Sequence, residues 1–113
     1  MTQAARPLKR GDVYWCELEP PDKHRPVVIL TRNSSIPYLT SVTVAPLTTR
    51  IRDIATQVVL ETFDGVPERC AISLDNIQTV PKDTLGGFIT SLSRVRLQEL
   101  NRAIGFALEL DQT

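Results

Sequence analysis

The sequence is poor in the residues that build metal centres and disulfide frameworks. Its 113 residues include two cysteines, Cys16 and Cys70, and one histidine, His24, with no CxxC or HxxxH spacing. A zinc site takes about four such ligands, so we expect no metal and no other cofactor. The sequence leaves a disulfide between the two cysteines open, but their position in apolar-patterned segments favours buried free thiols.

Long hydrophobic runs are absent as well. The longest are Val27 to Leu30 and, counting Gly105, Ala103 to Leu108, whereas a helix that crosses a bilayer takes about 20 residues. No cationic start leads into an apolar stretch, as an export signal would require. We therefore expect a soluble, cytoplasmic protein with no membrane partner.

The chain has no net charge, because 13 basic side chains balance 13 acidic ones. With 23% charged and 42% hydrophobic residues, it is neither a disordered tail nor a polycation. The balance hides an asymmetry: residues 1–52 carry a charge of +4 and residues 53–113 a charge of −4. Such a split indicates either a face for a polyanion or an ordinary mixed surface, and charge alone leaves both open.

The length suits one domain of ordinary size. The stretch Met1 to Lys9 is polar and has no periodicity, which predicts a flexible leader over residues 1–9. We expect the remaining residues, 10–113, to form a single domain.

Short segments typical of β-strands follow one another through most of this domain. The run Val27 to Leu30 is apolar throughout and suits a central strand covered on both faces. Asp64-Gly65 is a strong turn signal, and Gly86-Gly87 predicts a further bend. Five or six short strands with closely spaced turns predict a strongly coiled antiparallel sheet or a small barrel. The expected strands are residues 12–18, 26–31, 41–47, 56–60, 70–74 and 77–80.

The end of the chain has a different period. Ser93 can cap a helix in which Leu97, Leu100, Ile104 and then Ala107 or Leu108 recur at intervals of three or four residues. This apolar stripe predicts packing of the helix on the sheet. The expected fold class is therefore mainly β with a C-terminal helix (α+β).

Four blocks of the sequence resemble the MazF/PemK (Kid-like) toxins. They are residues 9–15 (KRGDVYW), 25–30 (RPVVIL), 44–49 (VAPLTT) and 73–80 (SLDNIQTV), and the likeness covers about residues 9–110 in the same order. The resemblance implies an SH3-like barrel with a C-terminal helix, and a homodimer. It also implies the toxin of a type II toxin-antitoxin system, an endoribonuclease held in check by a cognate antitoxin.

RNA cleavage needs a small set of chemical groups, and the sequence contains candidates for them. RNA supplies its own nucleophile, the 2′-hydroxyl, so a metal-independent nuclease needs proton transfer and stabilisation of the charge that develops on phosphorus. Arg25 stands at a junction between loop and strand, where its guanidinium can fork onto phosphate oxygens, and the hydroxyl of Thr48 can donate to the same group. In the resemblance, Arg25 and Thr48 match the catalytic arginine and threonine.

Two further residues are candidates for proton transfer, each with a plainer alternative. Asp75 matches the acid that some Kid-like members use as a base, although Ser73 replaces the arginine that accompanies it there. The alternative for Asp75 is a turn formed with Asn76. His24 titrates near neutral pH and directly precedes Arg25; it is either an auxiliary catalytic residue or an ordinary loop histidine.

Four residues are candidates for RNA binding. Lys23, Arg50 and Arg52 can follow the phosphate backbone of single-stranded RNA, or belong to a solvated loop face. Trp15 can stack on a base, or pack in the core or a dimer interface.

We therefore predict a sequence-selective endoribonuclease that acts on single-stranded mRNA. The main alternative is a toxin of the CcdB type, which shares the barrel, binds DNA gyrase and cleaves nothing. The C-terminal sequence ELDQT lacks the aromatic ending of that class. A third possibility is an SH3-like interaction module whose basic side is incidental.

Overall fold

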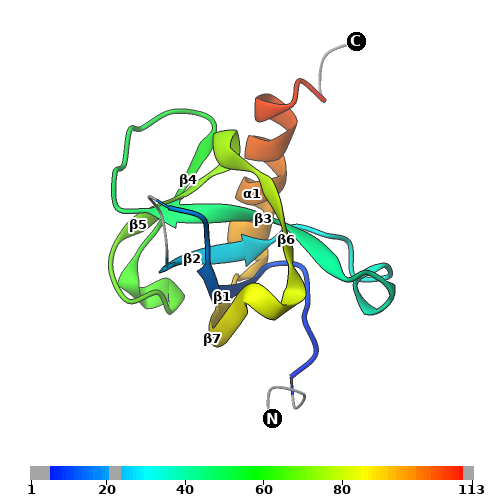
Figure 1. Cartoon of the computed structure of the whole chain (residues 1–113). Coiled ribbons are helices and arrows are strands. Elements are labelled where there is room, and N and C mark those ends of the chain that lie inside the picture. The colour runs from blue at the N-terminus through cyan, green and yellow to red at the C-terminus, as the bar shows by residue number, and fades with distance from the viewer. Residues whose placement is uncertain (1–5, 21–23, 111–113) are drawn as a thin grey trace.

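The computed structural model describes residues 6–20 and 24–110. Within these residues, seven β-strands and four short 3₁₀ helices precede one α-helix (Figure 1). The strands are β1 (Asp12–Glu17), β2 (His24–Ile29), β3 (Ser41–Thr48), β4 (Gln57–Leu60), β5 (Cys70–Ser73), β6 (Gln78–Pro81) and β7 (Leu85–Ser91). The helices are η2 (Ile36–Tyr38), η3 (Thr62–Asp64), η4 (Leu74–Asn76), η5 (Lys82–Thr84) and α1 (Arg94–Ala107).

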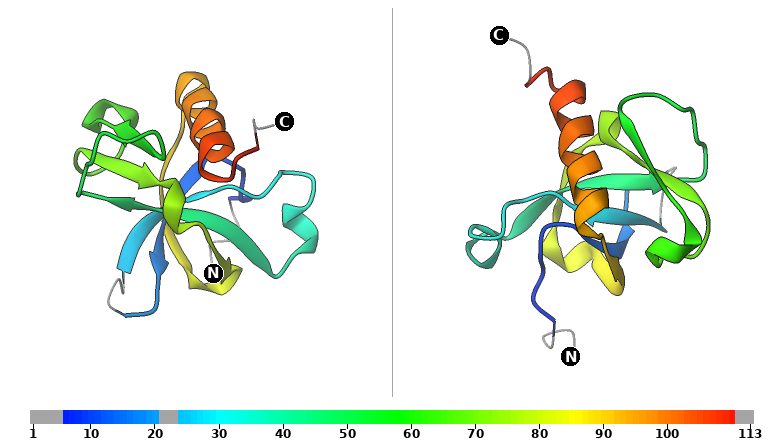
Figure 2. Two further views of the ribbon diagram at one scale, coloured as in Figure 1. Left: turned by 90° about the horizontal axis from the view of Figure 1, so that it is seen from above. Right: turned by 180° about the vertical axis from the view of Figure 1, so that it is seen from behind.

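All seven strands belong to one antiparallel sheet. Its order is β4-β5-β3-β2-β1-β7, and β6 pairs with the part of β3 that β5 leaves uncovered. In the described part of the chain β4 and β7 do not pair with each other, so the sheet is strongly coiled but not closed. Helix α1 crosses one face of this sheet, as the view from behind shows (Figure 2). The predicted fold class, mainly β with a C-terminal helix, is confirmed.

The sheet carries a hydrophobic cluster on each face. Because side chains alternate along a strand, Val13 and Val28 join the cluster that includes Leu100 of α1. Val27 and Ile29 join the cluster on the opposite face. The apolar run in β2 is thus covered on both sides, as its sequence predicted.

The predicted helix begins where expected. The hydroxyl of Ser93 accepts a hydrogen bond from the backbone N–H of Arg96 at 3.2 Å, which caps the first turn. Leu100 is fully buried, and Leu97 and Ile104 pack partly against the same cluster. The expected apolar stripe therefore faces the sheet.

Both cysteines are buried and free. Cys16 lies in the cluster with Val27, and Cys70 lies in the cluster with Leu100. Burial raises the pKa of both thiols, that of Cys70 to about 11. The expectation of two buried free thiols is confirmed.

The bend predicted at Gly86-Gly87 is wrong, because both glycines lie inside β7. That strand pairs with β1 in a register broken twice, between Val13 and Tyr14 and between Tyr14 and Cys16. Glycine in a strand accompanies such irregular pairing. Two adjacent glycines indicate a turn when only their neighbours are considered. The pairing that makes them part of a strand joins segments about 70 residues apart, so the local sequence does not show it.

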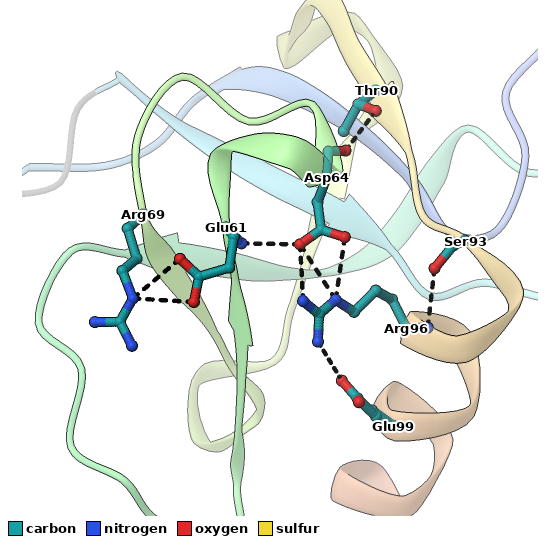
Figure 3. Close-up of polar contacts among 7 residues, drawn as sticks. All are labelled: Glu61, Asp64, Arg69, Thr90, Ser93, Arg96 and Glu99. Atoms are coloured by element: carbon teal, nitrogen blue, oxygen red, sulfur yellow. Dashed lines mark hydrogen bonds and ion pairs between the residues drawn. The ribbon is translucent and has the colours of Figure 1, made fainter.

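The turn after β4 is fastened to the helix. The carboxylate of Asp64 accepts hydrogen bonds from Nε and Nη2 of Arg96 at 3.0 to 3.2 Å, and Arg96 also donates to Glu99 (Figure 3). The backbone N–H of Glu61 donates to Asp64 as well, and the hydroxyl of Thr90 donates to the Asp64 carbonyl. We call this network the Asp64 clamp, since it fixes the turn to both α1 and β7.

Of the expected flexible leader, residues 1–5 lie outside the described part of the chain. Arg6 is described, and its guanidinium carbon lies 3.5 Å from the centre of the Phe88 ring. The same group lies 3.6 Å from Asp12 and donates to Ser91 at 3.3 Å. The leader as a whole stays a prediction.

Candidate functional site

Arg25 and Thr48 lie at the same end of two paired strands. Strands β2 and β3 are antiparallel with Val27 opposite Pro46, so the start of β2 meets the end of β3. Nη1 of Arg25 donates to the backbone carbonyl of Leu47 at 3.1 Å, which holds the guanidinium beside Thr48. The structure therefore brings together Arg25 and Thr48, the two catalytic candidates, although they are far apart in the sequence.

Both residues line an open cleft of about 1020 Å³. We call it the cleft, and its charged lining consists of Arg25, Arg50, Arg52 and Asp75, a formal charge of +2. Three guanidinium groups that converge on one depression make a binding site for anions. The other lining residues are Pro46, Thr48, Thr49, Ile54, Gln57, Ser73, Asn76, Ile77 and Gln78.

The loop that carries Arg50 and Arg52 is held by a neighbouring strand. Oε1 of Gln57 accepts from the backbone N–H of Arg52 at 2.8 Å, and Nε2 of Gln57 donates to the Arg50 carbonyl at 3.2 Å. The backbone N–H of Arg50 donates to the hydroxyl of Thr48 at 3.1 Å. These bonds fix the backbone while both exposed arginine side chains reach into the cleft.

Asp75 is in the cleft wall, on the short helix η4. Its Oδ2 accepts a hydrogen bond from the hydroxyl of Thr56 at 2.6 Å, and the backbone of Leu74 also bonds to Thr56. The carboxylate thus ties the residues before β4 to η4, and the turn with Asn76 that the sequence offered is this short helix between β5 and β6. It also faces the cleft, so both interpretations of Asp75 fit its position.

His24 and Trp15 belong to a second cavity that also adjoins Arg25. Their rings are stacked, with centres 5.0 Å apart and planes inclined by 24°, and Nδ1 of His24 lies 3.2 Å from the carboxylate of Glu17. His24 and Trp15 do not line the cleft; they line a smaller pocket of about 220 Å³ that shares Arg25, Thr48 and Thr49 with it. We call this second cavity the side pocket.

Lys23, the remaining predicted RNA-binding residue, lies outside the described residues. The sequence reasoning missed Gln57, which braces the basic loop, and Glu68, which lines the side pocket. Nothing in the local sequence marks either residue, because Gln57 reaches its site through the pairing of β4, and Glu68 reaches its site from the bend just before β5.

Two features are missing from the described residues. No group of three or more histidine, cysteine, aspartate or glutamate side chains among them could hold a metal ion. None of their helices is both long and apolar enough to cross a membrane.

Fold and site together define a small, strongly coiled β-sheet protein with one packed helix and a basic cleft where β2 and β3 meet. Residues 9–108 match the family described as the PemK-like, MazF-like toxin of type II toxin-antitoxin systems. The chain belongs to this PemK/MazF toxin family.

Two proteins that are similar to the chain in sequence agree with this assignment. The chain is 46% identical over 90 residues to endoribonuclease MazF3 of Mycobacterium tuberculosis, a match that covers 80% of this chain and 87% of that protein. It is 39% identical over 101 residues to the probable endoribonuclease MazF5 of the same species, covering 88% and 92%.

Solved structures agree as well. The Mycobacterium tuberculosis toxin MazF-mt6 superimposes with a TM-score of 0.80 and 41% identity, over 87% of this chain and 96% of that one. A mycobacterial endoribonuclease in complex with its cognate antitoxin gives a TM-score of 0.82 at 29% identity, over 91% and 96%.

Proposed function

We propose that this chain is a toxin endoribonuclease that cuts single-stranded mRNA at selected sequences without a metal ion. The observation that carries the proposal is the convergence of the Arg25 guanidinium and the Thr48 hydroxyl on one basic cleft. The family match supports an endoribonuclease and gives no support to the CcdB-type alternative. We therefore treat the basic side as a substrate site rather than as the incidental face of an interaction module.

The proposed reaction begins with attack of a ribose 2′-hydroxyl on the adjacent phosphorus. The 2′-oxygen forms a bond to phosphorus, the bond to the 5′-oxygen breaks, and the products are a 2′,3′-cyclic phosphate and a 5′-hydroxyl. Arg25 stabilises the extra negative charge on the phosphoryl oxygens with its forked N–H groups. Thr48 donates its hydroxyl to one of the same oxygens.

The reaction also moves two protons, one from the 2′-hydroxyl and one to the leaving 5′-oxygen. Asp75 lines the cleft and His24 lines the side pocket, and Arg25 lines both cavities. An in-line displacement needs its base and its acid on opposite sides of phosphorus. A carboxylate and an imidazole in two adjoining cavities suit that requirement, so we assign proton transfer to this pair.

The test is incubation of the protein with a mixed-sequence single-stranded RNA in EDTA, followed by mapping of the new ends. We expect cleavage with cyclic phosphate ends, reduced about 100-fold or more in Arg25→Ala and in Thr48→Ala, since each removes a donor to the developing charge. Exposed Arg94→Ala and Thr62→Ala are matched controls outside the cleft.

Three results would contradict parts of this proposal. Intact RNA together with inhibited gyrase would favour the CcdB-type alternative, and inertness in both assays would favour an interaction module. An unchanged rate in Asp75→Ala or His24→Ala would remove that residue from proton transfer.

The charge of the cleft also indicates what kind of protein partner can cover it. The cleft has a formal charge of +2, so a cognate antitoxin that covers it needs an acidic segment.

We also propose that the toxin works as a homodimer in the cytoplasm, where mRNA is found. Size-exclusion chromatography with light scattering tests the dimer.

A further inference from the structure

The side pocket adjoins the place proposed for the scissile phosphate. It shares Arg25, Thr48 and Thr49 with the cleft, so a phosphate held there leaves a neighbouring nucleotide at its mouth. At about 220 Å³ it is smaller than the roughly 300 to 1,000 Å³ that suit drug-sized ligands. Its size suits one planar ring system.

The walls of the side pocket also suit a base. Trp15 and its stacked partner His24 lie on one side, and the rings of Pro26 and Pro67 add apolar surface. Aromatic side chains hold bases by stacking whatever the sequence, because every base has a π-face. Selectivity therefore has to come from a polar group in the same wall.

Of the polar residues that line the side pocket, Glu68 is the acidic one. It lines the side pocket, and its carboxylate makes no hydrogen bond or ion pair within the described part of the chain, whereas its neighbour Arg69 binds Glu61 at 3.1 Å. Its negative charge reaches Cys70 in the same wall: after burial, Glu68 is the largest cause of the raised pKa of that thiol. Cys70 is thus a neutral thiol, and Glu68 carries the negative charge of the pocket.

The segment that carries Glu68 is rigidly placed. On its N-terminal side the Asp64 clamp fixes the turn to α1 and β7, and on its C-terminal side Arg69 ties it to Glu61 (Figure 3). Gly65 has φ +100°, and a Cβ there would collide with the Thr90 hydroxyl, so the turn follows β7 closely. A carboxylate held on such a frame can read a base edge without first having to be ordered.

A carboxylate only accepts hydrogen bonds. It therefore favours bases that present an exocyclic amino group, as cytosine, adenine and guanine do. Uracil suits it less, because the N3–H donor of uracil stands between two carbonyl oxygens that repel a carboxylate. On the basis of the proposed ribonuclease function, we infer that the side pocket holds a nucleobase next to the scissile phosphate and that Glu68 selects an amino-bearing base over uracil there.

The experiment starts from the cut sites that the wild type makes in a mixed-sequence RNA. Pairs of oligoribonucleotides that differ at one nucleotide beside the cut, cytosine in one and uracil in the other, then give a ratio of cleavage rates. We expect the wild type to prefer cytosine on one side of the cut, and Glu68→Gln to reduce that preference about tenfold, because the amide can donate to O4. Glu68→Lys, which only donates, should reverse it.

The control is Asp83→Asn on η5, which also removes an exposed negative charge but lies outside the side pocket. Binding of the same oligonucleotides with a 2′-deoxy sugar at the cut gives the preference as a ratio of Kd values without any chemistry. A folded Glu68→Gln that keeps the wild-type preference would overturn the inference, and so would one that loses all cleavage and binds both oligonucleotides as the wild type does. If the wild type itself leaves RNA intact, that result contradicts the proposed ribonuclease function, and so also the inference about Glu68 that rests on it.

Discussion

Asp64 and Arg96 form a largely buried ion pair, with side chains that are 9% and 19% exposed. Burial by itself would raise the pKa of the Asp64 carboxyl, but the hydrogen bonds from Arg96 and from the Glu61 backbone outweigh it, so the pKa lies below its usual value. The arginine guanidinium has its pKa raised by the same contact. Each group thus holds its partner in the charged form.

We predict that Asp64→Asn lowers the free energy of unfolding by about 2 kcal/mol, because it leaves the Arg96 charge partly buried and short of a partner. Urea unfolding at neutral pH measures the loss. The exposed pair of Arg69 and Glu61 supplies the comparison, since Arg69→Gln should cost under about 1 kcal/mol. Equal losses in the two variants would show that burial of the Asp64 clamp has no energetic consequence.

The same variant gives a pH dependence with a definite sign. A carboxyl whose pKa is lower in the folded than in the unfolded protein stabilises the fold above the unfolded value, about 3.9. That stabilisation is lost as the pH falls through the folded value. The stability difference between the wild type and Asp64→Asn should therefore be constant near neutral pH and shrink below about pH 4; a difference that grows in acid would contradict the assignment.

At the scale of the elements, helix α1 depends on its first turn as well as on its buried face. It has no acidic residue in the first turn and no basic residue in the last turn, so its ends gain little from the helix dipole. The Ser93 cap is the main local stabilisation of its start. The helix in turn supplies Arg96 to the clamp that places the wall of the side pocket.

Ser93→Ala should therefore lower the free energy of unfolding by about 1 kcal/mol, the usual cost of a lost N-cap. Ser93→Asp retains an acceptor for the Arg96 N–H and should restore most of that loss. Thermal or urea unfolding followed by circular dichroism distinguishes the two variants. If alanine and aspartate behave alike, the cap contributes nothing.

At the scale of the whole molecule, the chain combines zero net charge with a cleft of formal charge +2. The field near the site is therefore positive although the protein as a whole is neutral. Such an arrangement attracts a polyanion to one face, whereas the residues outside the cleft sum to a formal charge of −2. Arg50 and Arg52 extend this positive surface beyond Arg25.

RNA binding should consequently weaken with salt. For single strands, each phosphate contact contributes about −0.7 to the slope of log Kobs against log salt concentration. Arg50→Gln and Arg52→Gln should each make the slope shallower by about that amount, and Arg94→Gln should leave it unchanged. Fluorescence anisotropy with an RNA that carries 2′-deoxy sugars measures the slopes, and unchanged slopes would place both arginines outside the RNA contact.

The elements could be predicted where neighbouring residues determine them. Alternation identified β1 and β3, the apolar run identified β2, and Ser93 with its following stripe located α1. The prediction failed at Gly86 and Gly87, because their conformation depends on pairing with β1. Local preference is weak in a strand, and a distant partner overrides it.

The sequence by itself determined the family, six of the seven described strands together with the C-terminal helix, and which arginine and threonine to consider, because patterning, capping and motifs are properties of residues close together in the chain. Only the tertiary structure decided that Arg25 and Thr48 meet in one cleft and that Glu68 and Trp15 share a pocket beside it. The physical reason is that antiparallel pairing and helix packing bring together segments tens of residues apart, and those contacts, rather than any local preference, place the side chains of a site.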